Sequence, residues 1–155
     1  RVLGGANAIA GEWGHMPLPW PEDDERPGPR CYCGRHGCVE TWVSGPGLAS
    51  DHERTTGRAL TPAAIAEAAA NGDASCRATL DRHAGRLARA LPPGVHVVDP
   101  AVVVLGGGVS QLPGLCDTLF GRLPRHVFSD VVRTRVVLPM HGDSSGVRGA
   151  AWLWP

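Results

Sequence analysis

The stretch AVVVLGGG, residues 101–108, decides the fold. Its first five residues form a continuous apolar run rich in β-branched side chains, which is typical of a buried strand. The glycines at 106–108 then predict a tight turn, and a helical pattern resumes at about residues 115–123. A second short strand is predicted at residues 135–138, and a last helix at about residues 145–153. Because strands alternate with helices, the sequence predicts an α/β fold.

The residues before this strand favour helices. A short helix is predicted from Cys38 to about Ser50. Thr61-Pro62 begin a second helix that runs through residues 63–70, since threonine caps a helix well and proline is tolerated in the first turn. A third helix is predicted at about residues 74–91, where apolar residues recur at helical spacing. Pro92-Pro93-Gly94 should end or kink this third helix.

Length and composition describe one folded domain. The chain has 155 residues, of which 43% are hydrophobic and 19% charged, enough for a single core. Lys plus Arg equal Asp plus Glu at 15 each, so nothing favours a nucleic-acid or membrane surface, and no apolar run reaches membrane-spanning length. The opening residues RVLGG lack an initiator methionine, and we interpret them as the interior of a longer protein.

Three of the five cysteines lie within eight residues, at Cys31, Cys33 and Cys38. This cluster and the odd total fit metal binding in a reducing cytoplasm better than a disulfide framework. Zinc takes four ligands, commonly sulfur and imidazole nitrogen. His15 and His36 are the near candidates for the fourth ligand, and we favour His15 because His36 lies inside the ligand loop. The alternative is that these are ordinary buried or oxidised cysteines.

Two carboxylates flank the predicted metal ligands. Glu12 precedes His15 by three residues, and Glu40 follows Cys38 by two. If a metal ties His15 to the cysteines, both acids are drawn to one cleft, where carboxylates can accept hydrogen bonds from sugar hydroxyls. Zinc on one ring nitrogen of His15 would leave the other to face the ligand. On spacing alone, the alternative that these acids are solvated surface residues is slightly favoured.

The glycine turn at residues 106–108 allows close backbone approach to a nucleotide, but it is neither a Walker A loop nor a dinucleotide fingerprint. Glycine at such a turn also serves packing alone. We interpret the Asp23-Asp24-Glu25 run as a solvated loop, and Cys76 and Cys116 as buried small hydrophobes. Surface or satisfied core positions are expected for the remaining histidines, His52, His83, His96, His126 and His141.

Several motifs in order along the chain resemble the ROK family (repressors, open reading frames, kinases). They are GEWGH at 11–15, CYCGRHGCVE at 31–40, VVDP at 97–100, LGGGVS at 105–110 and HGDSSGVRGAAWLW at 141–154. The glutamate–x–glycine–histidine pair together with the C-x-C-G-x-x-G-C-x-E cluster is the most specific of these. The PLPW segment at 17–20 and the tail are similar to the fructokinase branch in particular.

The resemblance implies a fold and a set of site residues. The fold is the C-terminal α/β domain of the actin-like ATPase and hexokinase (ribonuclease H-like) superfamily, with a zinc-bound loop at residues 12–40 and a nucleotide-side region at about 60–155. The family's site residues carry over as zinc ligands His15, Cys31, Cys33 and Cys38, as sugar contacts Glu12, His15 and Glu40, and as adenosine contacts Gly106, Gly107 and Gly108.

The activity that the resemblance implies is ATP-dependent, Mg²⁺-supported phosphorylation of a hexose, foremost fructose to fructose 6-phosphate, by a cytoplasmic homodimer. This chain has no counterpart of the family's N-terminal domain, with its D-x-G-G-T segment and catalytic aspartate. No catalytic residue is therefore assigned, and the chain alone is expected to be inactive. The alternatives are a sugar-sensing transcriptional repressor, a kinase for N-acetylglucosamine, mannose or glucose, and a zinc-stabilised assembly module.

Overall fold

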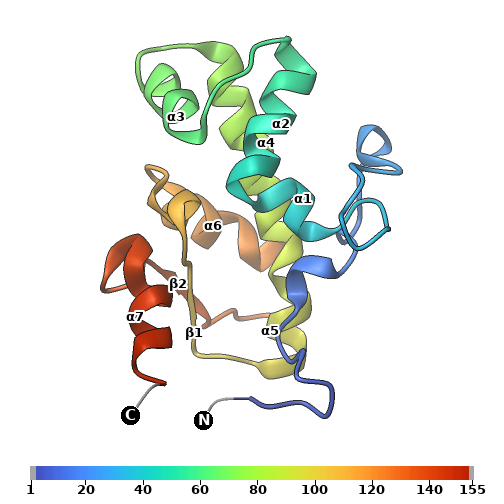
Figure 1. Ribbon diagram of the computed structural model, residues 1–155, viewed down its shortest axis with the longest axis vertical. Helices are drawn as coiled ribbons and strands as arrows, with labels where there is room; N and C mark the ends of the chain where they lie inside the picture. The colour runs from blue at the N-terminus through green and yellow to red at the C-terminus, as the bar shows by residue number, and fades with distance from the viewer. Residues whose placement is uncertain (1–2, 154–155) are drawn as a thin grey trace.

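The computed structural model describes residues 3–153. Its central helix is α4, Ala74–Ala90. It begins at Asp73, whose side chain accepts hydrogen bonds from the backbone N–H groups of Ser75 and Cys76. Figure 1 shows it running between the group of α1, α2 and α3 at one end and α5 at the other. The predicted helix at residues 74–91 is thus confirmed. Arg1, Val2 and the motif residue Trp154 lie outside the described residues.

The single helix predicted after the cysteine cluster is wrong, because two short helices stand there. They are α1, Val39–Val43, and α2, Gly45–Thr56. The break falls at Ser44, whose hydroxyl caps α2 by accepting a hydrogen bond from the Gly47 N–H. A Cβ at Gly47 would lie 2.6 Å from the Thr41 carbonyl oxygen, so only glycine lets the two helices meet this closely.

The helix start at Thr61-Pro62 and the helix end at Pro92-Pro93 are confirmed, whereas the sequence does not predict the helix that begins at Pro92. Helix α3, Pro62–Ala70, follows Thr61, whose hydroxyl accepts a hydrogen bond from the Ala64 N–H. Helix α4 ends at Ala90, and a separate helix, α5, Pro92–Val98, begins at the proline pair. The prolines therefore end one helix and open the next, a position where their missing N–H groups matter least.

The two predicted strands form a small parallel sheet. Strand β1, Val102–Val104, pairs with β2, Arg135–Val137, in the register Val102↔Arg135 to Val104↔Val137. Helix α6, Leu115–Arg122, lies on the connection between them and packs on β2. The expectation of a buried strand is wrong for β1, since its first two valines are half-buried and Val104 is 58% exposed. Within residues 3–153, β2 is the only strand that covers an edge of β1.

The core lies between α4 and the elements around it. The main cluster joins Trp42, Leu87 and Leu119 with their neighbours, and a second cluster under α3 joins Leu48, Ile65, Ala69 and Cys76. None of the helices in the described part of the chain combines the length and apolarity needed to cross a bilayer. The remaining elements are α7, Ser145–Ala151, and the 3₁₀ turns η1, Trp13–His15, η2, Asp23–Glu25, η3, Gly108–Gln111, η4, Leu123–Arg125, and η5, Gly142–Ser144.

Candidate metal and sugar site

The segment that carries His15 is fixed at both ends. The Trp13 indole N–H, in η1, donates a hydrogen bond to the Ala90 carbonyl of α4 at 2.6 Å. Beyond η1, residues 16–18 lie against residues 37–39. The N–H of Leu18 donates to the Gly37 carbonyl at 2.9 Å, and that of Val39 to the Met16 carbonyl at 2.8 Å. These contacts place His15 beside the last cysteine of the cluster.

The cysteine loop closes on itself through its own backbone. The Cys31 N–H donates to the Arg35 carbonyl at 2.8 Å, and the Gly34 N–H donates to the Cys31 carbonyl at 3.0 Å. Gly34 and Gly37 have φ of +89° and +71°, a region that favours glycine, so both let the loop turn tightly. Cys31 and Cys38 are buried and Cys33 is exposed, and no disulfide links any of the five cysteines, all of which lie within the described residues.

The four predicted ligand residues converge. Their ligand atoms all lie within 4.8 Å of one another, with Cys31 Sγ 3.5 Å from His15 Nδ1 and Cys33 Sγ 3.6 Å from Cys38 Sγ. A tetrahedral zinc site with bonds of about 2.3 Å to sulfur and about 2.0 Å to nitrogen has edges of about 3.5 to 3.8 Å. The donor set and spacing therefore fit one tetrahedral metal ion. His36 lies outside this cluster, which agrees with the choice of His15.

The thiols of the cluster differ in acidity. The pKa of Cys33 is lowered to about 7, first by a backbone hydrogen bond from Arg35 and then by bonds from the neighbouring cysteines. Burial and the other two cysteines raise the pKa of Cys38 to about 12. Three thiolates at this spacing repel one another, and a cation among them is what would hold all three deprotonated.

The opposite side of the His15 ring faces a carboxylate and a phenol. Glu40, in the first turn of α1, has Oε2 3.7 Å from His15 Nε2. The Tyr32 hydroxyl shares a hydrogen bond with the same nitrogen at 2.6 Å. Partial loss of solvent, followed by the charges of Glu40, Cys31 and Glu12, raises the pKa of Tyr32. Glu12 is exposed at the start of η1, on the side of Tyr32.

One predicted sugar residue, Glu40, and the three predicted nucleotide residues, Gly106–Gly108, line the same hollow. This open cavity of about 700 Å³ has Trp13, Gly14 and Glu40 on one wall and Gly106–Gly108 on another, with the beginnings of α2 and α3 between them. Its size falls within the range of small-molecule sites. Neither Glu12 nor the four-ligand cluster is part of its lining, so Glu40 and Gly14 are what connects the metal corner to the cavity.

Internal packing does not explain the three glycines of the turn. A Cβ at Gly106, Gly107 or Gly108 would meet no atom of the described residues within 4 Å. Only Gly107, with φ of +80°, needs glycine for its backbone conformation. The turn leads into the short 3₁₀ turn η3, and α6 follows at Leu115, where the sequence predicts the helical pattern to resume.

Sequence reasoning missed Tyr32 and the role of Trp13. Tyr32 lies between two predicted ligands, and its position in the C-x-C motif is the signal that could have drawn attention to it. Trp13 lies between Glu12 and His15, but its acceptor, the Ala90 carbonyl, is 77 residues away and carries no sequence signal.

Fold and site together define a hexokinase-like α/β domain with a Cys₃His cluster. The chain belongs to the ROK family, whose sequence model matches residues 1–155. It is 38% identical to the N-acetyl-D-glucosamine kinase of Escherichia coli (strain K12), over 99% of this chain and 52% of that protein. The chain therefore spans about half the length of this relative.

Two solved structures share the fold. The ROK hexokinase from Thermus thermophilus superposes with a TM-score of 0.81 at 29% identity, over 99% of this chain and 50% of that one. A ROK family glucokinase from Streptomyces griseus, in complex with glucose and AMPPNP, has a TM-score of 0.77 at 25% identity, over 94% of this chain and 51% of that one. The predicted hexokinase-like fold class is thereby confirmed, and the Cys₃His cluster is consistent with the zinc motif of the family.

Proposed function

We propose that this chain forms the zinc- and sugar-binding half of an ATP-dependent hexose kinase that acts on N-acetylglucosamine. The observation that carries the proposal is the cavity of about 700 Å³ in which Glu40 and the glycine turn face each other. Phosphoryl transfer needs the acceptor hydroxyl and the nucleotide to approach within one enclosed site, and this cavity offers a wall for each.

The sugar side is assigned to Glu40, His15 and Glu12. The carboxylate of Glu40 accepts hydrogen bonds from sugar hydroxyls, and His15 Nε2 lies beside it at 3.7 Å. Glu12 adds a second carboxylate on the same side of Tyr32. Gly14 lies directly beside this carboxylate, since a Cβ there would be 3.4 Å from the Glu40 Cβ, an ordinary contact distance.

The metal is assigned as a structural zinc ion held by His15 Nδ1, Cys31, Cys33 and Cys38. When bound, zinc neutralises the thiolates and fixes which ring nitrogen of His15 is free. His15 Nε2, which shares a hydrogen bond with the Tyr32 hydroxyl at 2.6 Å, is then the nitrogen that a sugar hydroxyl can bond in place of Tyr32. Zinc analysis of the purified protein should give one equivalent, and Cys33→Ser should abolish it. Less than a tenth of an equivalent in the unchanged protein would refute the assignment.

The nucleotide side is assigned to Gly106–Gly108, where open space lies above every Cα. ATP would bind with Mg²⁺, which neutralises the phosphates. We assign the general base to no residue of this chain, and we keep the division into a zinc loop at 12–40 and a nucleotide-side region at about 60–155. Gly108→Val should weaken nucleotide binding at least tenfold with little loss of stability, because the new side chain fills only the cavity.

The choice of sugar follows the relatives. The sequence tail favours fructose, but the 38% identical relative is an N-acetyl-D-glucosamine kinase, and the structure at 25% identity holds glucose. Both sugars are aldohexoses, so we place N-acetylglucosamine ahead of fructose as the substrate. The named relatives likewise favour a kinase over the alternative of a repressor.

A sugar panel tests this proposal. A protein of the relatives' length that contains this chain should be assayed with N-acetylglucosamine, glucose, mannose and fructose. The highest kcat/KM is expected for N-acetylglucosamine, and a preference for fructose would restore the other assignment. Sugar-dependent DNA binding without phosphorylation would instead identify a repressor. Glu40→Ala should raise the sugar KM at least tenfold, whereas Glu67→Ala, on the exposed side of α3, should not.

A further inference from the structure

The loop between His15 and Cys31 is anchored by a buried carboxylate. Glu25 is only 5% exposed, so the expectation of a solvated Asp23-Asp24-Glu25 run is wrong for its last member. Glu25 Oε1 accepts hydrogen bonds from Arg86 Nε and Arg89 Nη2, each at 2.7 Å. Its Oε2 accepts from the Glu22 N–H at 2.8 Å. Burial acts to raise the pKa of Glu25, but the bonds from the two arginines outweigh it and leave the pKa lowered.

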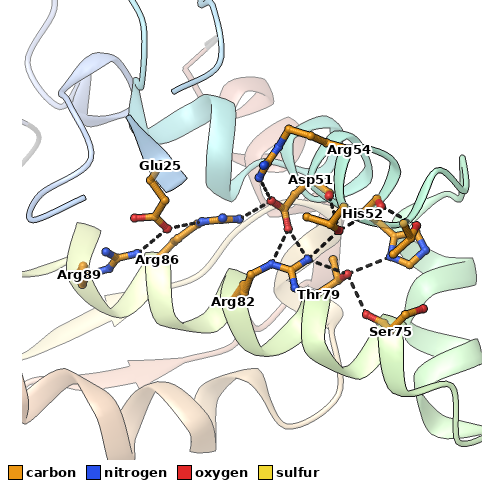
Figure 2. A network of polar contacts seen from close by, with 11 residues as sticks. Glu25, Asp51, His52, Arg54, Ser75, Thr79, Arg82, Arg86 and Arg89 are labelled. Carbon is orange, nitrogen blue, oxygen red and sulfur yellow. Dashed lines mark hydrogen bonds and ion pairs between the residues drawn. The ribbon is translucent and has the colours of Figure 1, made fainter. Parts of the chain in front are cut away.

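Arg86 connects this loop to two helices. Its guanidinium, in a residue 1% exposed, also forms an ion pair with Asp51 of α2, with Nη1 2.9 Å from Oδ1 (Figure 2). The Cζ atom of the guanidinium lies over the Trp42 ring, 4.3 Å from the ring centre. Trp42 belongs to α1, two residues beyond Glu40. A single side chain of α4 therefore contacts the loop, the helix that carries the proposed sugar carboxylate, and α2.

The anchored loop between His15 and Cys31 also contacts the cysteine loop at residues 31–38. The Gly37 N–H donates to the Pro29 carbonyl at 2.9 Å. A Cβ on Gly28 would lie 2.6 Å from the Gly37 Cα, so the two backbones are in direct contact. At its other end the loop is held where Arg89 Nη1 donates to the Trp20 carbonyl at 2.8 Å. The loop is thus fixed on both sides, between α4 and the residues that carry the thiols.

Net stability is a weak reason for such an arrangement. Removing ions from water costs several kcal/mol each, and buried ion pairs can often be replaced by apolar residues without loss of stability. What a buried, fully hydrogen-bonded carboxylate does offer is a fixed position, because each bond has a preferred direction. The segment that gains from a fixed position here is the one that joins the first metal ligand to the second.

We propose that Glu25 is a positioning residue for the metal site, which acts through Arg86 and Arg89. The pair of arginines holds the loop so that His15 and the cysteines are already close before the ion binds. Arg86 also holds Trp42, and thereby sets α1 so that Glu40 stays beside His15. This inference rests on the proposed zinc site, and it adds a residue that contacts neither metal nor sugar.

The test compares two carboxylates that share Arg86. Glu25→Gln and Asp51→Asn each remove one charge from a buried acid bonded to arginines, but only Glu25 lies on the loop between the ligands. Unfolding by urea and zinc affinity, from competition with a chromophoric chelator, should be measured for both. If a variant is only less stable, its apparent Kd for zinc equals the intrinsic Kd divided by the folded fraction. The apparent Kd therefore hardly changes while nearly all of the protein is folded. Measured where the proteins are folded, zinc affinity therefore reports geometry.

Both variants should be less stable, but only Glu25→Gln should weaken zinc binding, by tenfold or more. Equal zinc affinity in Glu25→Gln and the unchanged protein, or equal losses in both variants, would overturn the proposal. If Glu25→Gln does not fold, Arg89→Lys keeps the charge and removes the two-pronged contact, and the same loss of zinc affinity is expected from it. No zinc in the unchanged protein would mean that the proposed metal site itself is wrong, a result distinct from failure of the positioning role.

Discussion

His83 should make the stability of the protein depend on pH. The ring lies in α4, 1% exposed, and neither ring nitrogen has a hydrogen bond of standard geometry among the described residues, although a weaker backbone contact with Trp42 partly offsets the effect of burial on its pKa. Burial, with a smaller contribution from the charge of Arg86, lowers the pKa of His83 to about 4. Its ordinary value is about 6.5. The folded protein therefore keeps His83 neutral at a pH where the unfolded chain would already bind a proton.

The sign and size follow from linkage. Between pH 6.5 and 4 the unfolded state binds more protons at this residue than the folded state, so stability rises with pH. The contribution is fully present above pH 6.5 and is lost as the pH falls towards 4. The interval corresponds to roughly 3 kcal/mol in all, of which about 2 kcal/mol is lost by pH 5.

Urea unfolding at half-unit steps from pH 4.5 to 7.5 measures this dependence. His83→Leu and His83→Gln do not titrate, so both should reduce the loss of stability towards pH 5 by about 2 kcal/mol. Subtracting each variant from the unchanged protein cancels the contributions of other groups, including the metal ligands. Curves that run parallel across this range would refute the reasoning, and an effect in only one variant would point to polarity rather than titration.

Other predictions concern local geometry. Gly28→Ala should lower the free energy of unfolding in urea by about 3 kcal/mol or more, because the new Cβ would lie 2.6 Å from the Gly37 Cα. The control is Gly34→Ala, which is also at positive φ but has no described atom within 4 Å of the new Cβ. It should lower the free energy of unfolding by only about 1 to 2 kcal/mol. Asp73→Ala should lose the α4 cap and about 1 kcal/mol, which Asp73→Asn should largely retain; equal losses would argue against capping. Tyr32→Phe should change the sugar KM severalfold but keep one equivalent of zinc, because the Tyr32 hydroxyl bonds His15 Nε2 and not Nδ1. Loss of zinc in this variant would contradict the assignment of Nδ1 as the zinc ligand.

Local sequence signals predict local structure in this chain. The apolar run at 101–105 gives β1, and Thr61-Pro62 gives the start of α3, because strand and cap preferences act over a few residues. The spacing of the three cysteines likewise brings their sulfurs together, since they share one short loop, whereas His15 reaches them from another segment. In each case the physical cause lies within the segment itself.

Long-range partners decide what the sequence does not reveal. Glu25 looks like its acidic neighbours, and its burial depends on arginines 61 and 64 residues further on. The exposure of the β1 side chains depends on which elements pack on the two faces of the sheet, and the composition of the strand does not determine that. His83 fits the apolar face of α4 only because the surrounding helices close over it, so the expectation of a satisfied core histidine is wrong.

The proline pair after α4 explains how the site is fixed to this helix. A carbonyl in a helix normally accepts from the N–H four residues later, but the last turn has no such partners. For Ala90 that donor would be the N–H of Gly94, which bonds the Leu91 carbonyl instead at 3.0 Å because α5 begins a new helix at Pro92. The Ala90 carbonyl is left free to accept the Trp13 indole at 2.6 Å, and Trp13 carries the segment with His15. The break between α4 and α5 therefore supplies the acceptor, the Ala90 carbonyl, that holds one wall of the proposed sugar site.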